Sequence, residues 1–209
     1  TGSAATFGHG LGVAPDAVIV KNLGATEDWN VWIRAETPKI GLLNETAAFY
    51  SPGAAGINGA TITSDVIGLG TSVTANGSSA TYVAYCFSSV KGFSKFGSYV
   101  GNGNATSPTF VYTGFKPAWV MLKVTNAADS WNMYDSKRSP FNGTGSRLRA
   151  NLSNADDTGT EYQTCNFYSN GFAPQGSDTT SNGSGRPYIY MAFAESPFVS
   201  SSGIPATAR

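Results

Sequence analysis

Few side chains in this sequence could perform acid–base or nucleophilic chemistry. His9 is the only histidine in the 209 residues, and a glycine flanks it on each side. A Ser-His-Asp triad would need a serine within reach of His9 and a carboxylate to orient the ring, and the sequence has no G-x-S-x-G elbow to carry that serine. One histidine and two distant cysteines also lack the ligand spacing of a zinc site. We therefore predict no catalytic residue, no metal site and no cofactor.

Carboxylates are the second class of catalytic candidate. Asp156 and Asp157 adjoin each other, Glu161 follows in the same loop, and Glu195 comes directly after the last expected strand. Two carboxylates that face one groove can hydrolyse a glycosidic bond. An aspartate in a turn, however, usually accepts hydrogen bonds from its own backbone. A glycan depolymerase that uses Asp157 or Glu161 is therefore the least favoured of the functions considered.

Aromatic side chains are the better candidates, and they point to binding instead of catalysis. Sugar sites commonly place a flat ring against a pyranose face, while amides or backbone groups fix the hydroxyls. The rings that could do this are Trp29, Trp32, Trp119, Trp131, Tyr112, Tyr134, Tyr162 and Tyr168. Rings that the scaffold does not need are the more plausible ligand contacts. On this basis we select Trp119, Phe141 and Tyr162 as candidate ligand-binding residues, with Trp32 as a fourth.

Two blocks of sequence occur twice, and they indicate which residues belong to the scaffold. Residues 12–32 and 114–134 align without a gap and share a proline, a lysine and a Trp-Asn pair. Residues 74–87 and 180–193 share Asn-Gly and a tyrosine-rich run that ends in phenylalanine. We assign to the structural core of the repeats Trp29, Trp131, Asn30, Asn132, Phe87 and Phe193. Because no acid, base and nucleophile triplet recurs with them, the repeat gives no support to a duplicated catalytic centre.

Strands must position these residues. Residues 17–21 and 119–123 are short β-rich runs, and 82–87 and 188–193 are the strongest strand signals. An Asn-Gly pair precedes each strong strand, which predicts turns with positive φ. The best helical candidate is residues 40–50. The density of short strands predicts an all-β fold, a β-sandwich or jelly-roll built from two halves of roughly a hundred residues each.

The repeat also predicts the organisation of the chain. We expect a first β repeat at residues 1–96, a connector at 97–109, a second β repeat at 110–198 and a tail at 199–209. Aromatic residues in and just before the connector indicate that it is packed, since flexible linkers are rich in glycine and serine. The tail is rich in serine, alanine, glycine and proline.

Composition narrows the class of partner. Charged residues are only 12% of the chain and its formal net charge is zero, so it lacks the basic face that a nucleic-acid binder needs. No apolar run approaches the roughly 18 residues of a membrane helix, and we predict no membrane insertion. Cys86 and Cys165 are interpreted as two free thiols, with a bridge between the halves as the alternative.

Several blocks resemble a poorly characterised domain at the C-terminus of tail-fibre and other structural proteins of marine bacteriophages, including cyanophages. The most specific are K-F-G-S-Y-V-G-N-G at 95–103 and M-A-F-A-E-S-P-F at 191–198, together with H-G-L-G-V-A-P-D-A-V-I-V-K-N at 9–22. The resemblance covers nearly the whole chain. It implies a virion component on the outside of the tail or capsid, and it transfers no catalytic or ligand residue.

These expectations combine into one leading function and one rival. The leading function is a non-enzymatic tail-fibre or receptor-binding tip that recognises a host cell-surface polysaccharide. We expect a homo-oligomer, a trimer by analogy with fibres, that also contacts other virion proteins. The rival is a purely structural virion module that decorates the capsid or caps a fibre.

Overall fold

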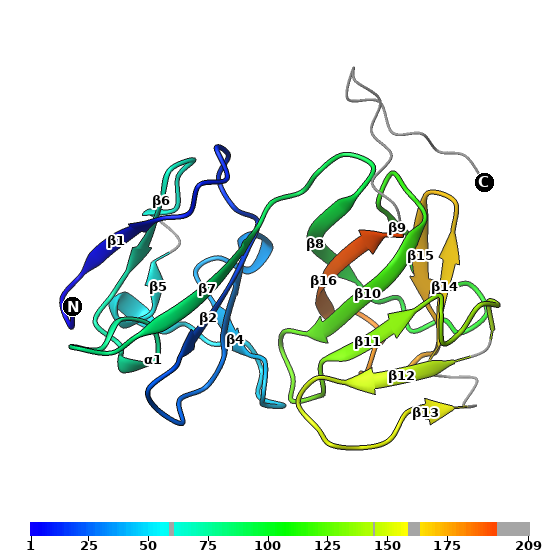
Figure 1. Cartoon of the computed structure of the whole chain (residues 1–209). Helices are drawn as coiled ribbons and strands as arrows, with labels where there is room; N and C mark the ends of the chain where they lie inside the picture. Colours follow the sequence, from blue (N-terminus) through cyan, green and yellow to red (C-terminus); the bar gives the residue numbers. More distant parts are fainter. Residues whose placement is uncertain (59–60, 144, 159–163, 196–209) are drawn as a thin grey trace. The chain divides into compact units, whose positions relative to one another are not determined.

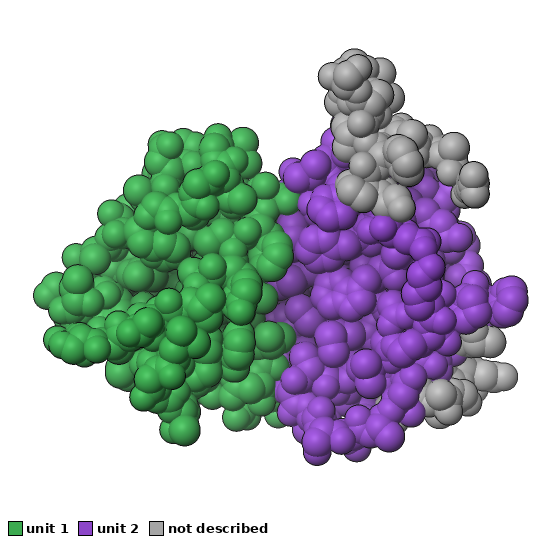
Figure 2. Space-filling view, viewed as in Figure 1, with its two compact units in different colours: residues 1–88 green, residues 89–209 purple. Residues whose placement is uncertain are grey.

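The computed structural model describes residues 1–58, 61–143, 145–158 and 164–195 (Figure 1). The chain divides into two compact units, residues 1–88 and 89–209 (Figure 2). This division does not coincide with the boundary expected after residue 96, and the expected tail lies outside the described residues. Regular structure is almost entirely antiparallel β, which confirms the predicted fold class and is consistent with a β-sandwich. Within the described ranges, no helix is long and apolar enough to cross a membrane.

Unit 1 consists of two antiparallel sheets around one core. The larger sheet has the strand order β4 (Ile40–Leu42), β3 (Asn30–Ile33), β2 (Ala17–Asn22) and β7 (Tyr82–Phe87). The smaller sheet has the order β1 (Ala5–Gly8), β6 (Val66–Leu69) and β5 (Ile57–Asn58). The helical elements are η1 (Arg34–Glu36), η2 (Gly53–Ala55) and α1 (Val73–Asn76). Val18, Trp32 and Ile67 pack together in the core, so the apolar faces of both sheets are buried against each other.

Unit 2 has the same kind of core between a six-stranded and a three-stranded sheet. Its six-stranded sheet runs β13 (Asp157–Thr158), β12 (Ser146–Arg149), β11 (Asn132–Asp135), β10 (Pro117–Val124), β16 (Pro187–Ala194) and β8 (Ser94–Val100). Its second sheet runs β14 (Cys165–Tyr168), β15 (Gly171–Pro174) and β9 (Val111–Tyr112). Tyr99, Leu122, Phe172 and Tyr188 meet in the core between them.

The repeated sequence blocks occupy corresponding places in the two units. β4-β3-β2-β7 in unit 1 corresponds to β12-β11-β10-β16 in unit 2, in the same order. The side-chain amide of Asn30 donates to the backbone of Asp28 and Thr74. Asn132 makes the corresponding bonds to Ser130 and Thr180. Both asparagines are almost fully buried, as expected for scaffold residues.

The aromatic residues assigned to the repeat core differ in burial. Trp131 is fully buried, whereas Trp29 is half-buried and stacks on Tyr85 with ring centroids 6.5 Å apart. Phe87 and Phe193 are also half-buried. Trp29 and Trp131 thus occupy equivalent positions in the repeat but differ in burial, whereas Phe87 and Phe193 are buried to a similar degree.

One local expectation is wrong, and a second is confirmed only in part. Residues 40–50 do not form a helix, because Ile40–Leu42 pairs with β3 and Ile40 also bridges to Tyr50. The expected turns follow the Asn-Gly pairs, with Ala80 N–H donating to Gly77 O and Arg186 N–H donating to Gly183 O, but the positive φ lies at Ser79 and Gly185 and not at the pairs themselves. The structural reason for Asn-Gly lies in the asparagine side chain.

Asn182 is a buried hydrogen-bonding centre in unit 2. Its Nδ2 donates to Asn102 Oδ1, to Asn104 O and to Gly176 O, and its Oδ1 accepts the backbone N–H of Asn102. Asn76 does the same in unit 1. Its Nδ2 donates to the carbonyls of Ser3 and Gly70, and its Oδ1 accepts from the amino group of Thr1. Each amide thus ties the segment that precedes the first repeated block of its unit to the loop before the closing strand.

Four buried tyrosines make unit 2 sensitive to alkali. Burial raises the pKa of Tyr188 and Tyr190 to about 12, and it also raises the pKa of Tyr99 and Tyr134. Above the ordinary tyrosine pKa of about 10, the unfolded phenols ionise while the folded ones stay protonated. The free energy of unfolding is therefore maintained below pH 10 and lost as the pH rises through 12.

We expect the unfolding free energy of unit 2 to fall between pH 10 and 12 by up to about 1.4 kcal/mol per pH unit for each such tyrosine. Urea titrations at a series of pH values measure this slope. Tyr190→Phe removes one ionisable phenol and should make the slope shallower. An identical slope in that variant would contradict the assignment.

Candidate functional site: an aromatic face on unit 2

The four selected ligand-binding residues differ in how exposed they are in the structure. Trp32 is only 1% exposed and belongs to the core of unit 1, so its selection as a ligand contact is wrong. Trp119 is half-buried beside Phe193, with ring centroids 5.7 Å apart. Tyr162 lies outside the described residues. Phe141 is 74% exposed.

A more compact group of exposed rings lies on the three-stranded sheet of unit 2. Side chains alternate between the two faces of a strand. Phe167 and Phe172 therefore point into the core, and Tyr168, the neighbour of Phe167, points outward, whereas all four residues of β15 are buried. The outward side chains include Tyr112, 60% exposed, and Tyr168, 41% exposed. Phe110, which directly precedes β9, is 48% exposed.

Strand register brings these rings together. Tyr168 is directly opposite Gly171 on β15, and Gly171 is directly opposite Tyr112 on β9. The two tyrosines therefore lie in one row across the sheet with a glycine between them. The ring of Phe110 contacts Tyr168 edge to face, with centroids 5.9 Å apart. We call Phe110, Tyr112 and Tyr168 the aromatic face (β9, β14 and β15 in Figure 1).

Gly171 allows the rings to lie close to the backbone. A Cβ at this position would lie 2.2 Å from the carbonyl oxygen of Val111 and 2.7 Å from the ring of Phe110. Any larger residue would separate β9 from β15 or displace Phe110. The glycine therefore leaves room for the ring of Phe110 in the middle of the aromatic face.

Amide side chains border the aromatic face and hold a neighbouring loop against it. Asn142 pairs with the backbone of Phe167, donating to its carbonyl and accepting from its N–H. Asn166 Oδ1 accepts the N–H of Gly143. These bonds fix the loop that carries Phe141 next to β14. Phe141 stays a candidate ligand contact, on an exposed loop beside β14.

The electrostatic character of the aromatic face is mild. Lys95 reaches over Tyr112 with its Nζ 5.3 Å from the ring centroid, which is within the range of a cation–π contact. The rest of the face consists of rings and amides. Flat rings with bordering amides suit an uncharged or weakly anionic polyhydroxylated ligand.

Three carboxylates of unit 2 are engaged in ion pairs. Arg138 binds Asp135 at 2.6 Å and Asp156 at 3.1 Å. Glu195 pairs with Lys137. The side chain of Asp157 and the whole of Glu161, on which the depolymerase alternative rests, lie outside what the structure describes.

His9 is hydrogen-bonded through both ring nitrogens in unit 1. Its Nδ1 accepts the N–H of Leu11 at 3.2 Å, so its Nε2 carries the proton toward Thr63 O at 3.1 Å. Both contacts are with backbone groups, which gives the ring a structural role in its loop. Cys86 and Cys165 are free thiols, and burial raises the pKa of the Cys165 thiol well above its ordinary value.

Comparison with known proteins gives one match. Residues 1–197 match the family described as Domain of unknown function (DUF7483). The chain belongs to this family. No curated protein and no solved structure matches it. Membership in the DUF7483 family therefore accounts for nearly the whole chain without assigning an activity.

Proposed function

We propose that this chain is a non-enzymatic binding module on the surface of a bacteriophage particle, and that it recognises a host cell-surface polysaccharide through the aromatic face. The single observation that carries the proposal is the row of Tyr168, Gly171 and Tyr112 with Phe110 packed over it. Exposed rings that touch one another on a rigid sheet form a preorganised surface, which lowers the entropic cost of binding.

The virion location rests on the sequence blocks that resemble phage tail-fibre domains. In that setting the module assembles as a homotrimer with other virion proteins. Several copies displayed together convert weak contacts with a repeating polymer into avidity, without any new contact. A shallow, neutral aromatic surface is the kind of site that depends on such avidity.

We expect Tyr112→Ala and Tyr168→Ala each to weaken polysaccharide binding about tenfold or more, because central aromatic contacts dominate binding energy. Binding is measured by affinity electrophoresis in gels that contain host surface polysaccharide. Tyr50→Ala is the matched control, since Tyr50 is 43% exposed but lies in unit 1. Equal retardation of all four proteins would contradict the assignment of the site.

The same gels separate the rival functions. A purely structural module would show no retardation by any host polysaccharide. A depolymerase would shorten the polymer, and it would stop doing so after Asp157→Asn or Glu161→Gln.

A further inference from the structure

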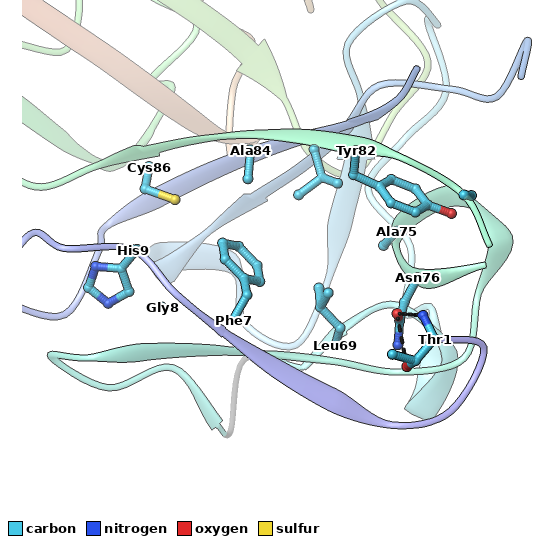
Figure 3. Close-up of a pocket in the computed structure, with 12 residues that line it drawn as sticks. Thr1, Phe7, Gly8, His9, Leu69, Ala75, Asn76, Tyr82, Ala84 and Cys86 are labelled. Carbon is cyan, nitrogen blue, oxygen red and sulfur yellow. Dashed lines mark hydrogen bonds between the residues drawn. The ribbon is translucent and has the colours of Figure 1, made fainter. Parts of the chain in front are cut away.

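Unit 1 contains a pocket of about 550 Å³ that the proposed function does not use. Tyr82, Ala84 and Cys86 line it from β7, and Phe7 and Leu69 line it from the opposite sheet (Figure 3). Ala84 is exposed, so the pocket can be reached alongside β7. The lining combines apolar side chains with polar groups of Thr1, His9 and Asn76, which suits an aromatic ring that carries a hydroxyl group.

β7 is an edge strand among the described residues, because the four-stranded sheet ends with it. Thr81 O accepts the N–H of Leu23, on the side of β2. Backbone groups alternate between the two sides of an antiparallel strand. The N–H and C=O groups of Tyr82, Ala84 and Cys86 therefore point toward the open edge. The same three residues thus supply side chains to the pocket and backbone groups to the edge beside it.

In unit 2, a further strand occupies the edge that corresponds to the open edge of β7. β16 corresponds to β7, and β8 pairs with it along the corresponding edge. Tyr99 of β8 lies opposite Tyr188 and stacks on it, with ring centroids 4.9 Å apart. Its hydroxyl donates to Ser181 O at 2.6 Å. The ring is buried between the two sheets of unit 2.

The residues that hold Tyr99 have counterparts in the pocket of unit 1. By the repeated block, Tyr188 corresponds to Tyr82 and Ser181 corresponds to Ala75, and both Tyr82 and Ala75 line the pocket. Tyr190 of unit 2 corresponds to Ala84, a far smaller side chain. Unit 1 thus keeps the edge and the stacking tyrosine and has more room beside them.

We propose that the edge of β7 and the adjoining pocket form an acceptor site for an extended polypeptide strand of a partner protein. The strand adds antiparallel to β7 through the backbone groups of Tyr82, Ala84 and Cys86. One aromatic side chain of the strand enters the pocket opposite Tyr82, as Tyr99 does opposite Tyr188. Strand addition takes affinity from the backbone and selectivity from the pocket, so the expected partner sequence has tyrosine or phenylalanine at that position.

A labelled peptide that copies residues 91–103 tests the proposal with the full chain. We expect a saturable rise in fluorescence anisotropy on addition of protein. Replacing the tyrosine that corresponds to Tyr99 with serine should weaken binding about tenfold or more, because the buried ring is lost. Hydrogen exchange should show new protection at 82–87. Sarcosine in place of the glycine that corresponds to Gly97 removes an edge hydrogen bond and should also weaken binding.

Variants of the protein locate the site independently. Ala84→Pro removes an N–H that points to the edge and should abolish peptide binding. Tyr85→Ala, on the other face of β7, is the matched control and should leave it unchanged. If Ala84→Pro does not fold, the serine and sarcosine peptides still decide the question with the unaltered protein.

Several results would overturn the proposal. They are the absence of peptide binding, equal binding of the serine peptide, or protection at 187–194 in place of 82–87, which would indicate strand exchange in unit 2. Tight binding of free p-cresol without protection of β7 would identify a small-molecule pocket instead. None of these results depends on polysaccharide binding by unit 2.

Discussion

Replacing Tyr99 with alanine should lower the free energy of unfolding of unit 2 by about 3–5 kcal/mol, the range for deleting a large aromatic side chain from a core. The ring stacks on Tyr188 and meets Phe172 edge to face at 6.3 Å. Its hydroxyl donates to Ser181 O, so the substitution also leaves a buried carbonyl without that donor. Both effects reduce stability in the same direction.

Urea unfolding monitored by tyrosine fluorescence measures this change. Tyr112→Ala is the control, because Tyr112 is exposed and its loss should cost no more than about 0.5 kcal/mol. The Tyr99 variant should also acquire a cavity in unit 2 that resembles the pocket of unit 1. Equal destabilisation by the two substitutions would show that β8 does not anchor the core through this ring.

Replacing Asn182 with alanine should lower the free energy of unfolding by about 1–3 kcal/mol, the cost of leaving a buried polar group such as the Gly176 carbonyl without a partner. The amide of Asn182 joins Asn102, Asn104 and Gly176, and alanine replaces none of these bonds. The carbonyl of Gly176 would lose a donor in a buried position, whereas Asn102 and Asn104 are exposed and can bind water instead.

Asn76→Ala should likewise lower the free energy of unfolding of unit 1, and it should also change hydrogen exchange locally. Asn76 binds the amino group of Thr1 and the carbonyl of Ser3, so hydrogen exchange over residues 1–8 should accelerate. Asn154, which is exposed, provides the control substitution in unit 2. If Asn76→Ala and Asn182→Ala are as mild as Asn154→Ala, the buried amides are not the reason for the repeated Asn-Gly.

The all-β fold could be predicted because the strand signals are local. Apolar runs after proline and the alternation along residues 82–87 and 188–193 are visible without tertiary information. The structural role of Asn30 and Asn132 could also be inferred from their repetition. The Asn-Gly pairs correctly indicated turns, but the role of their asparagine side chains could not be predicted, because the partners lie far away in sequence, such as Asn102 for Asn182.

The β8 strand escaped prediction for a different reason. Phe96 and Tyr99 are three residues apart and so lie on opposite faces of the strand, and both are buried. A strand buried on both faces shows no alternation, and part of it was therefore assigned to a connector. Trp32 was misjudged similarly, since all four residues of β3 are buried.

The candidate site could be predicted only in part. Tyr112 and Tyr168 were among the rings that could contact a sugar, but nothing in the sequence made them stronger candidates than Trp119. What brings them together is the register of three strands through Gly171. That register is a tertiary property, and neither residue's local sequence encodes it.

The most direct test of the proposed function is fluorescence microscopy of labelled protein on a panel of marine bacterial hosts, with the oligomeric state verified beforehand. The account predicts selective labelling of some hosts, loss of labelling after their surface polysaccharide is stripped, and loss with a Tyr112→Ala/Tyr168→Ala variant that is folded. Tyr50→Ala should label as the unaltered protein does. Absence of labelling at micromolar protein, or labelling that survives both polysaccharide stripping and the double substitution, would contradict polysaccharide recognition by the aromatic face.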